Sequence, residues 1–443
     1  MITRLSSSPD LVVRATSSIA PYENRPIDPR HVARELEVGA VLDASFQRAG
    51  NRFRATARLI DAAGGQALWA GKIDLDFDDI FAVQDDVANG IAQALAARLA
   101  SDATRRYTPS PEAFEMVLRA QEPYRTGLRS GFERSIQLLE GVVAREPAYA
   151  DAWGQLSKTY HSMADAGFDP DPRWFAKAED AARRALALEP EHFGARFTIA
   201  ALELVRGRKR EAYPLLVALH RARPNHAPIL HYLAYLFRLS NLVDAALDAD
   251  HRSIDADPSS PWAYWMSCRI AFEAGRLEEG LRMLERVRGR FLSHRTTRSV
   301  VLIALRQQER LAEMAAQAAD SVMALEESSH VGFELAYALI RVGRPEEARA
   351  LVAGIEPHAG FDMDFAAYSA ALHAWLGDAD MAFARLARAV ELGNDSLYLY
   401  ERADLYGPLH GDPRWGPFLA GVQARCAEDA REFTWPVDAE PFS

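Results

Sequence analysis

The chain has 443 residues, of which 49% are hydrophobic, so it is long enough to bury a sizeable core. Its formal net charge of −11 and its pI of about 5.6 disfavour direct binding to nucleic acid or to an anionic membrane surface. Two cysteines in no metal or redox spacing, and no apolar run near ~18 residues, predict a cytoplasmic protein with reduced thiols.

The N-terminal region mixes helix and strand signals. Leu11–Val13 is a short strand candidate, and Asp28 followed by Pro29 is a start signal for a helix over 30–37. Alternating apolar residues predict three further strands, over 40–47, 53–61 and 67–73. The glycine-containing stretches between these strands have typical hairpin chemistry. An apolar stripe at helical spacing then predicts a long helix over 78–100.

Several short runs in this region follow the pattern of a known bacterial domain. They are ARELEVGAVL (33–42), GNRFR (50–54), LID (59–61), LWA (68–70) and DIFAVQD (79–85). On these runs, residues 1–104 resemble the TolB-like domain, a small α/β domain that precedes tetratricopeptide repeats in many bacterial proteins. Relatives of that domain often stand downstream of a winged-helix transcription regulator or a nucleotide cyclase, so the resemblance implies a regulatory setting.

The opening strand of the resembled domain has no counterpart, because the chain begins at a position that matches the helix after it. Its absence leaves an unpaired sheet edge near Leu11–Ala15, and an exposed edge invites pairing with another chain. We therefore expect one of two outcomes: an upstream start that restores the strand, or a gap filled by a homodimer or a partner strand at the N-terminal domain.

A motif with a period near 34 residues organises the rest of the chain. Similar phrases end at Pro190, Pro224 and Pro258, which stand 34 residues apart. A tight-turn mark recurs at steps of 33 to 35 residues, at Gly207-Arg208, Ser240-Asn241, Gly275-Arg276, Glu309-Arg310, Gly343-Arg344 and Gly377-Asp378. Two independent marks with one period indicate helix–turn–helix repeats of the tetratricopeptide type. One such unit cannot bury its apolar faces alone, so the units must stack.

The repeats predict a mainly α fold, a tetratricopeptide α-α superhelix preceded by a small α/β domain. We expect the array over 108–395, in about eight helical pairs, and a capping helix near 417–431 with a tail in 396–443. After Ala166 an insertion lengthens one unit, either as a functional loop or as a tolerated extension. Pro214 falls inside a predicted helix, which we expect to start late or to kink there.

Patterns that carry catalytic or metal chemistry are weak. An Asp-x-Asp-x-Asp run at 74–78 starts like a calcium loop, but Asp79 stands where the loop needs glycine, which favours a solvated acidic turn. Three histidines that are close in sequence straddle a helix end and a proline, which disfavours a shared metal: His220, His226 and His231. No nucleophile or acid–base pair is recognisable. We therefore expect no enzyme activity, no cofactor and no metal.

What remains is the concave face of the superhelix, which the first helix of each pair lines. Counting from the turn marks places these residues on that face: Lys158, His161, His231, Tyr235, Arg238, Trp265, Arg269, Arg306, Tyr337 and Arg341. Aromatic and arginine side chains in a concavity are typical binding anchors, and the arginine fork suits carboxylates. The alternative interpretation is that these side chains pack between helices.

These observations favour a non-enzymatic scaffold that binds a protein or peptide, in particular an acidic one, in the groove of a tetratricopeptide superhelix. The alternative is the regulatory half of a transcription regulator or a nucleotide-cyclase system whose effector domain is missing or encoded upstream. An in-frame winged-helix or cyclase segment upstream of Met1 would favour the alternative.

Overall fold

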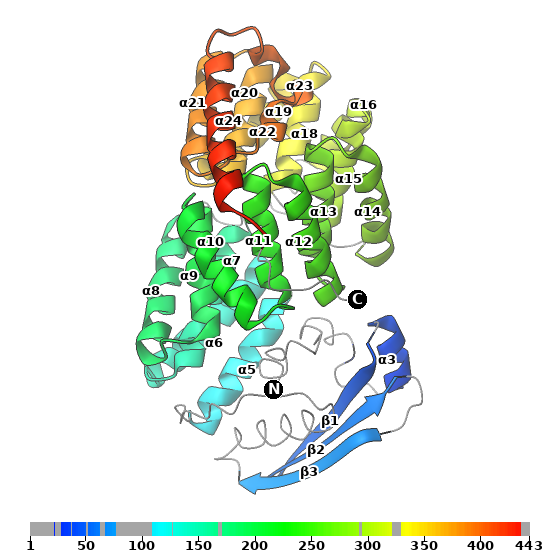
Figure 1. Ribbon diagram of the computed structural model, residues 1–443, viewed down its shortest axis with the longest axis vertical. Coiled ribbons are helices and arrows are strands. Elements are labelled where there is room, and N and C mark those ends of the chain that lie inside the picture. Colours follow the sequence, from blue (N-terminus) through cyan, green and yellow to red (C-terminus); the bar gives the residue numbers. More distant parts are fainter. Residues whose placement is uncertain are drawn as a thin grey trace.

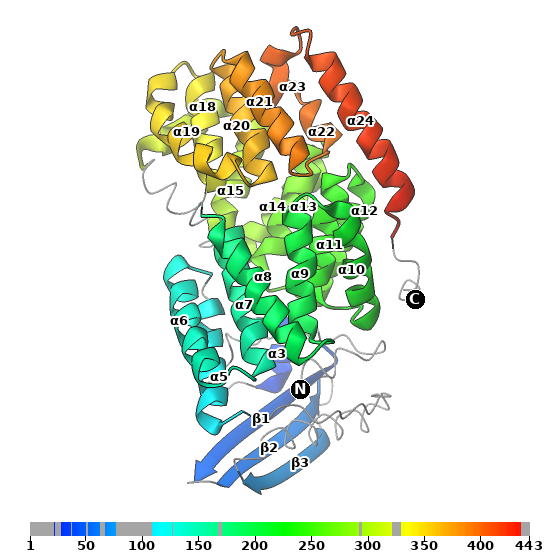
Figure 2. The ribbon, with the colours of Figure 1, turned by 90° about the vertical axis from the view of Figure 1, so that its left-hand side faces the viewer.

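The computed structural model describes residues 22, 28–36, 38–49, 52–62, 67–76, 109–125, 127–166, 171–291, 295–320 and 329–435. A small α/β part is followed by a long array of antiparallel helix pairs that coil into a superhelix (Figure 1 and Figure 2). This arrangement confirms the predicted fold class, a mainly α superhelix preceded by a small sheet.

The N-terminal part consists of one helix and a three-stranded antiparallel sheet. In α3 (Pro29–Glu35), the Asp28 side chain accepts a hydrogen bond from the Arg30 amide at 3.0 Å, as an N-cap does. The strands pair in the order β1-β2-β3 and are β1 (Ala40–Ala49), β2 (Arg52–Asp61) and β3 (Ala67–Asp76). They confirm the three predicted strands. The predicted strand at Leu11–Val13 and the predicted helix over 78–100 lie outside the described residues.

The array pairs a first helix, here called helix A, with a second, helix B. The pairs are α5 (Pro111–Arg125) with α6 (Arg129–Arg145), α7 (Ala150–Asp165) with α8 (Arg173–Leu188), α9 (Phe193–Val205) with α10 (Lys209–Ala222), α11 (Ala227–Leu239) with α12 (Val243–Ala256), α13 (Pro261–Glu273) with α14 (Leu277–Arg290), α15 (Arg295–Gln307) with α16 (Leu311–Ala316), α18 (Ser329–Arg341) with α19 (Pro345–Ala359), and α20 (Met363–Trp375) with α21 (Ala379–Glu391). After α16 the chain continues as a 3-10 helix, η3 (Gln317–Asp320).

The turn between helix A and helix B explains the period. From α9 onward one residue per turn has a φ between 57° and 81°, and these residues stand 34 apart: Gly207, Asn241, Gly275, Glu309, Gly343 and Gly377. The uneven steps around Ser240 disappear, because Asn241 is the residue that takes the left-handed conformation. Asparagine tolerates that region, whereas Glu309 holds it at a cost of about 1 kcal/mol that the packed array has to offset.

Pro214 does not delay its helix as predicted. α10 begins at Lys209 and runs through the proline to Ala222, with Ala212, Leu216 and Leu219 on its buried side. The prediction of a late start is therefore wrong. Because each helix B packs against two neighbouring pairs, tertiary contacts hold this helix together despite the missing amide.

The C-terminal segment keeps the register but not the shape of a repeat. The period places another helix A at 397, and α22 (Leu397–Tyr400) begins there but ends after four residues. The chain continues through α23 (Ala403–Tyr406) and η4 (Gly407–Leu409) to the long α24 (Trp415–Glu432). α24 matches the predicted capping helix, although its position is not that of a simple end cap.

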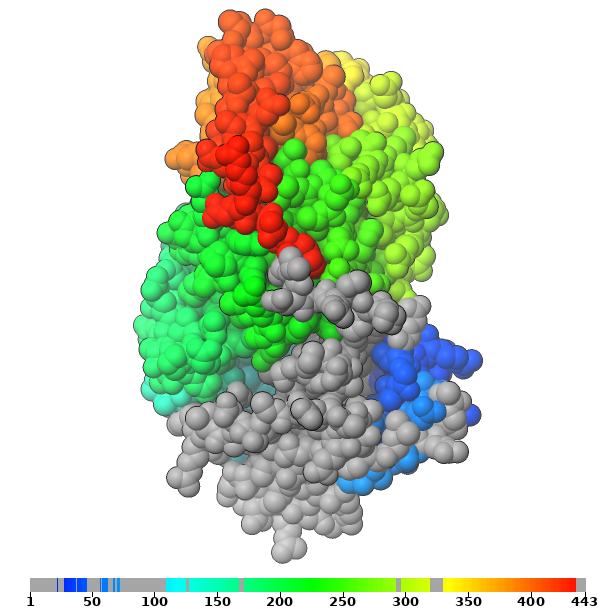
Figure 3. Space-filling view, viewed as in Figure 1, coloured from blue at the N-terminus to red at the C-terminus, as the bar shows by residue number. Residues whose placement is uncertain are grey.

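α24 returns to an early part of the array. It runs down the side of the molecule and ends next to α10 and α11, which are nearly 200 residues earlier (Figure 1 and Figure 2). The space-filling view shows this C-terminal segment, in red, lying across the boundary between the middle and the last units (Figure 3). Lys209 on α10 donates to Asp395 at 2.8 Å and also to Asp429 on α24, and all three side chains are buried. The superhelix is thus closed on itself.

Candidate binding surface

Every residue selected from the sequence for the concave face lies on a helix A, from α7 to α18. The described surroundings divide most of them into two groups. Lys158 and His161 on α7 lie among half-buried aromatic rings, whereas the arginines from Arg238 onward and Tyr337 lie beneath α20 and the segment after Leu392. His231, Tyr235 and Trp265 have other partners. The two groups therefore meet different surroundings, although the sequence pattern treats them alike.

The second group includes a carboxylate held between two arginines, here called the Asp364 cluster (Asp364, Arg238, Arg269, Glu273 and Asn394). Asp364 is the second residue of α20, and its carboxylate accepts from Arg238 at 2.6 and 2.8 Å and from Arg269 at 2.9 Å. Glu273 accepts from the same two arginines at 3.0 and 2.6 Å. Asn394 donates to Asp364 at 3.1 Å.

Burial is nearly complete in the Asp364 cluster. The side chains of Arg238 and Arg269 are 0% and 1% exposed, and those of Glu273 and Asp364 are 3% and 6% exposed. Two positive and two negative charges balance, so the group remains ionised without water around it. Burial acts to raise the pKa of Asp364, but Arg238 and Arg269 outweigh it and hold that pKa well below its usual range.

Asp362, two residues before Asp364, has the opposite shift. Its side chain caps α20 by accepting from the amides of Asp364 and Phe365 at 2.8 and 3.0 Å. Burial, and then the charge of Asp364, raise the pKa of Asp362 to about 7. Two neighbouring carboxyls therefore titrate far apart because only one of them faces the arginines.

A second carboxylate is held further along the array, in what is here called the Asp404 cluster (Asp404, Arg306, Glu334, Tyr337, Arg341, Trp375 and Arg402). Arg306 donates to Asp404 at 2.8 Å and to Glu334 at 2.9 and 3.3 Å, and Arg402 donates to Asp404 at 2.8 Å. The main-chain oxygen of Asp404 also accepts three hydrogen bonds, from Trp375 at 2.8 Å, from Arg341 at 3.3 Å and from the Tyr337 hydroxyl.

The expectation of arginines standing free to meet an acidic ligand therefore needs correction. Arg238, Arg269 and Arg306 are 0%, 1% and 3% exposed, and carboxylates of this same chain bind them. The physical reason is the closure of the superhelix, which lays α20 and the segment after Leu392 onto the face that helices A present. Whether these arginines contact a partner stays a prediction.

The first group lies along what is here called the aromatic row (Phe193, His226, Phe197, Tyr232, His161, Phe175 and Phe361). Successive ring centroids in it are separated by 5.1, 6.2, 5.1, 5.9, 6.4 and 6.3 Å. Most of these rings are half-buried, and His161 is buried. Cations lie at its margin: Lys158 over the ring of Tyr124 at 4.6 Å, and Arg223 over Phe193 at 3.5 Å. Apolar faces flanked by cations are a typical setting for recognition of a polypeptide.

The remaining predicted residues have partners within the molecule. His231 contacts Asp250 at 3.3 Å, and Tyr235 donates to Asp364 at 3.2 Å. Trp265 is buried, with its ring against that of His330 at 5.1 Å. Sequence reasoning missed Asp364, Asp404 and Trp375, which complete the two clusters. Because these residues contact others up to 129 positions away, no local pattern could have identified the pairing.

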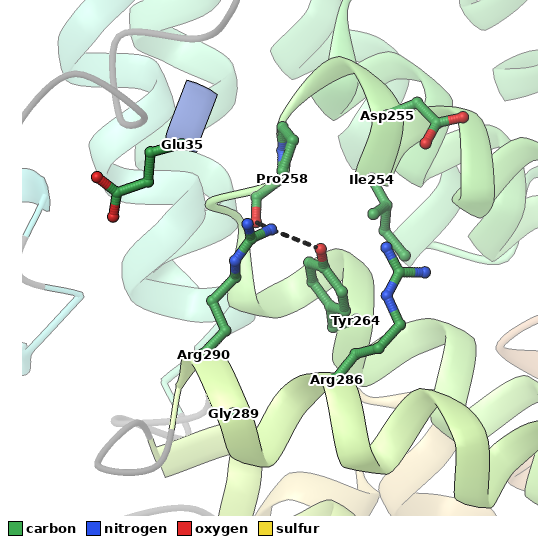
Figure 4. Close-up of a pocket in the computed structure, with 8 residues that line it drawn as sticks. All are labelled: Glu35, Ile254, Asp255, Pro258, Tyr264, Arg286, Gly289 and Arg290. Atoms are coloured by element: carbon green, nitrogen blue, oxygen red, sulfur yellow. Dashed lines mark hydrogen bonds between the residues drawn. The ribbon is translucent and has the colours of Figure 1, made fainter. Parts of the chain in front are cut away.

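A cavity of about 570 Å³ lies where α3 approaches the ends of α12, α13 and α14 (Figure 4). Arg290 donates to the Pro258 carbonyl and to the Tyr264 hydroxyl, both at 3.0 Å, and the Glu35 carboxylate points away from it (Figure 4). Two acidic and two basic side chains line this cavity, so their charges offset one another. This lining offers no nucleophile and no metal-ligand set.

The histidines, cysteines and acidic residues that the structure describes do not gather into a metal site. No group of three or more His, Cys, Asp or Glu side chains able to hold a metal is found among the described residues. The histidines considered in the sequence go to separate places: His220 packs on Trp435, His226 on Phe193, and His231 contacts Asp250. The side chains of the acidic run at 74–78 lie outside the described residues. Cys268 and Cys426 are buried free thiols.

Within the described ranges, no helix combines the length and the apolar character needed to cross a bilayer. No protein-family model matches the chain. Among curated proteins, "Putative adenylate cyclase 3" from Rhizobium meliloti (strain 1021) is 36% identical over 161 residues, which cover 35% of this chain and 27% of that protein. The match thus spans about a quarter of the length of that curated relative.

Solved structures with related helical arrangements are distant in sequence. The complex Cut9–Hcn1 has a TM-score of 0.46 at 10% identity and covers 69% of this chain and 55% of that one. Yeast Tom70 has a TM-score of 0.39 at 12% identity, and the match covers 75% of this chain and 70% of Tom70. A tetratricopeptide repeat protein from Parabacteroides merdae has a TM-score of 0.37 at 11% identity, and the match covers 61% of this chain and 98% of that protein.

Proposed function

We propose that this protein is a non-enzymatic scaffold that binds a protein or peptide partner on the face formed by its helices A. The aromatic row carries the proposal, because it places half-buried rings from α8, α9 and α11 side by side around the buried His161 of α7. Apolar side chains that are left partly exposed side by side, rather than scattered singly, are typical of an interaction surface. Lys158 and Arg223 at the margin favour a partner with acidic residues beside apolar ones.

The buried arginines selected from the sequence can still contact a partner, but only after a change in the structure. Arg238, Arg269 and Arg306 contact a partner only if the chain's own carboxylates leave them. We propose no direct contact with nucleic acid, since the chain carries a net charge of −11. A cytoplasmic location and a homodimer through the N-terminal domain stay predictions.

Affinity capture with a matched pair of variants tests the scaffold. The full chain, the double variant Phe193→Ala/Phe197→Ala and the control Leu188→Gln serve as baits in a lysate of the host. Leu188 is an exposed apolar residue outside the aromatic row, with 42% of its surface accessible. We expect a protein that the wild type and the control enrich equally and that the double variant loses at least ~5-fold.

Direct binding must then be reproduced with the purified partner, and circular dichroism must show that the double variant remains helical. Enrichment that is the same for all three baits would remove the aromatic row as the binding surface. A bait that enriches no protein over an unrelated helical solenoid would contradict the scaffold itself.

A second candidate function is the regulatory half of a nucleotide-cyclase system. The 36% identity over 161 residues to a protein named as a putative adenylate cyclase favours it. In that case the helical array would receive a partner and pass a signal to a cyclase domain. The gene's upstream sequence tests this candidate: an in-frame cyclase segment would support it, and an unrelated upstream gene would count against it.

A further inference from the structure

The segment after Leu392 leaves the repeat geometry at one defined point. All helices A from α9 to α20 have 13 residues, and α22 begins where the next one is due, at Leu397. α22 stops after Tyr400. The chain then forms the short helices α23 and η4 instead of continuing as one long helix. Gly407 and Pro408 do not suit a helix interior, which contributes to the break.

The diverted chain lies against other units. Asp404 receives hydrogen bonds from Arg306 on α15, from Tyr337 and Arg341 on α18, and from Trp375 on α20. These donors come from helices A of three successive units, and they bind both the carboxylate and the main-chain carbonyl of one residue. Arg341 is also stacked on Trp375, with its guanidinium carbon 3.9 Å from the ring centroid. This arrangement therefore binds the side chain and the main chain of one aspartate at the same time.

The contact is accessible at its edge. The Asp404 side chain is 26% exposed, whereas that of Asp364 in the other cluster is 6% exposed. Arg306 keeps a second partner, Glu334, with which it makes two hydrogen bonds at 2.9 and 3.3 Å. The arginine therefore remains paired when Asp404 leaves, so the site can open without an isolated buried charge.

Both ends of the segment are fastened independently. On its N-terminal side, the Asp395 amide donates to Leu239 at 3.0 Å and the Ser396 hydroxyl donates to the Arg238 carbonyl at 3.1 Å. On its C-terminal side, α24 is joined to α10 through Lys209 and Arg210. Leu405, Tyr406 and Leu409 are buried in the core, so the part that can leave the site is the short stretch up to Asp404, residues 401–404. The superhelix remains closed meanwhile, and the tether returns this stretch at a high effective concentration.

We propose that Arg306, Tyr337, Arg341 and Trp375 form a recognition site for an aspartate within an extended peptide, which the chain's own Asp404 occupies in cis. A partner's acidic peptide then binds there only by displacing residues 401–404. This inference rests on the proposed scaffold function and adds its regulation: the chain competes with its partner for one site.

Peptide binding to the full chain tests this competition. The probe is a fluorescein-labelled synthetic peptide with the sequence of residues 399–409, LYERADLYGPL, and a second peptide carries asparagine in place of its aspartate. The proteins are the wild type, Asp404→Asn and the control Asp412→Asn, which removes a carboxylate eight positions away that pairs with Arg414 on the surface. Fluorescence anisotropy measures binding.

We expect Asp404→Asn to bind the aspartate peptide at least ~10-fold more tightly than the wild type or Asp412→Asn does, because the cis competitor is weakened. The asparagine peptide should bind Asp404→Asn at least ~5-fold more weakly than the aspartate peptide. Adding Trp375→Phe, which keeps the ring and removes the N–H donor, should weaken binding several-fold. Equal binding by all proteins, or equal binding of both peptides, overturns the proposal.

Hydrogen exchange of the wild type gives a result that does not depend on any variant folding. We expect the amides of 401–404 to exchange at least ~10-fold faster than those of α18 and α20, because the segment opens locally. Equal protection would show that the segment is a fixed part of the core and overturns the proposal. A dimer in light scattering that Asp404→Asn abolishes would place the segment in a second copy, which overturns occupancy in cis. Failure of these tests leaves the capture experiment at the aromatic row untouched, so the two proposals fail separately.

Discussion

The Asp364 and Asp404 clusters use the same chemistry in different settings. In each, an aspartate from the last part of the chain binds arginines on helices A. Asp364 stands in a helix that keeps the 34-residue register, and its side chain is 6% exposed. Asp404 stands where the register breaks, and its side chain is 26% exposed.

The difference teaches how to separate a structural ion pair from an exchangeable one. Asp364 cannot leave without exposing two arginines that have one other carboxylate between them, Glu273. Asp404 can leave because Arg306 retains Glu334. Burial and the number of remaining partners, rather than the identity of the residues, decide which contact can respond to a ligand.

The largest effect is expected for Asp364→Ala. Removal of this carboxylate leaves an excess positive charge in a site that is almost free of solvent, which costs about 3–5 kcal/mol of unfolding free energy. Asp404→Ala should cost only about 1 kcal/mol, because its site is partly hydrated. Urea unfolding followed by circular dichroism measures both. Equal losses would break the distinction between the two clusters.

The second effect concerns the place where the array meets its own C-terminal segment. Gly207 has a φ of 77°, and a Cβ there would lie 2.4 Å from the Leu392 carbonyl oxygen. Gly275 has a φ of 74° with nothing within 4 Å of such a Cβ. An alanine held at positive φ lowers the free energy of unfolding by about 1 kcal/mol at either position. Gly275→Ala is therefore the control for this backbone effect.

Only Gly207→Ala also forces the closure of the superhelix apart, and we expect an additional loss of about 2 kcal/mol in thermal or urea unfolding. Equal losses of unfolding free energy in the two variants would mean that Leu392 can move away from the turn between α9 and α10 at little cost. Closure would then contribute little to stability.

The third effect separates the two neighbouring carboxyls at the start of α20. Since the pKa of Asp362 is raised from 3.8 to about 7, the folded state holds more protons than the unfolded state in this window. This contribution is complete near pH 4 and disappears as the pH rises through 7. Asp362→Asn keeps a capping side chain but cannot titrate.

We therefore expect the stability of the wild type relative to Asp362→Asn to fall by about 2.5 kcal/mol between pH 5 and pH 8. Thermal melts at several pH values measure this difference. A difference that stays constant, or that grows with pH, would mean that Asp362 is ionised across the whole range.

The smallest effect is expected far from both clusters. Glu346 and Arg349 on α19 form an ion pair with 75% and 72% of their side chains exposed. Water and salt screen such a pair, so Glu346→Gln should leave the urea midpoint unchanged within error. A measurable loss would indicate that exposed pairs also matter in this array, and the contrast between buried and exposed carboxylates would need revision.

Local features of the fold could be predicted from the sequence, because each depends on neighbouring residues. The left-handed positions at Gly275, Gly343 and Gly377 follow from glycine itself, and the three strands follow from alternation and hairpin residues. Lys158 and Arg238 could be placed on helices A by counting from those turns. Such counting fixes the face of a helix and not what covers that face.

The surroundings of the candidate site could not be predicted in this way. The partner of Arg238 is 126 residues away, and it meets Arg238 only because the superhelix curves enough to close. Curvature is a sum of small rotations between successive units, and no single motif encodes it. The end of the array near residue 395 was predicted, but the contacts that the chain makes after Leu397 were not, because they join distant units.

The contact of Lys209 with Asp429 joins residues 220 positions apart and has a consequence for biosynthesis. A linear solenoid can fold unit by unit as it leaves the ribosome. Here α10 has to wait for α24, a delay of roughly 10–40 s at typical rates of translation. During that interval the Lys209 ammonium and the apolar surface beneath α24 lack their final cover. A nascent chain halted before Asp395 should therefore depend on chaperones more strongly than a chain extended beyond Asp429 does, and the appearance of α24 should bring the last cooperative step in the folding of the array.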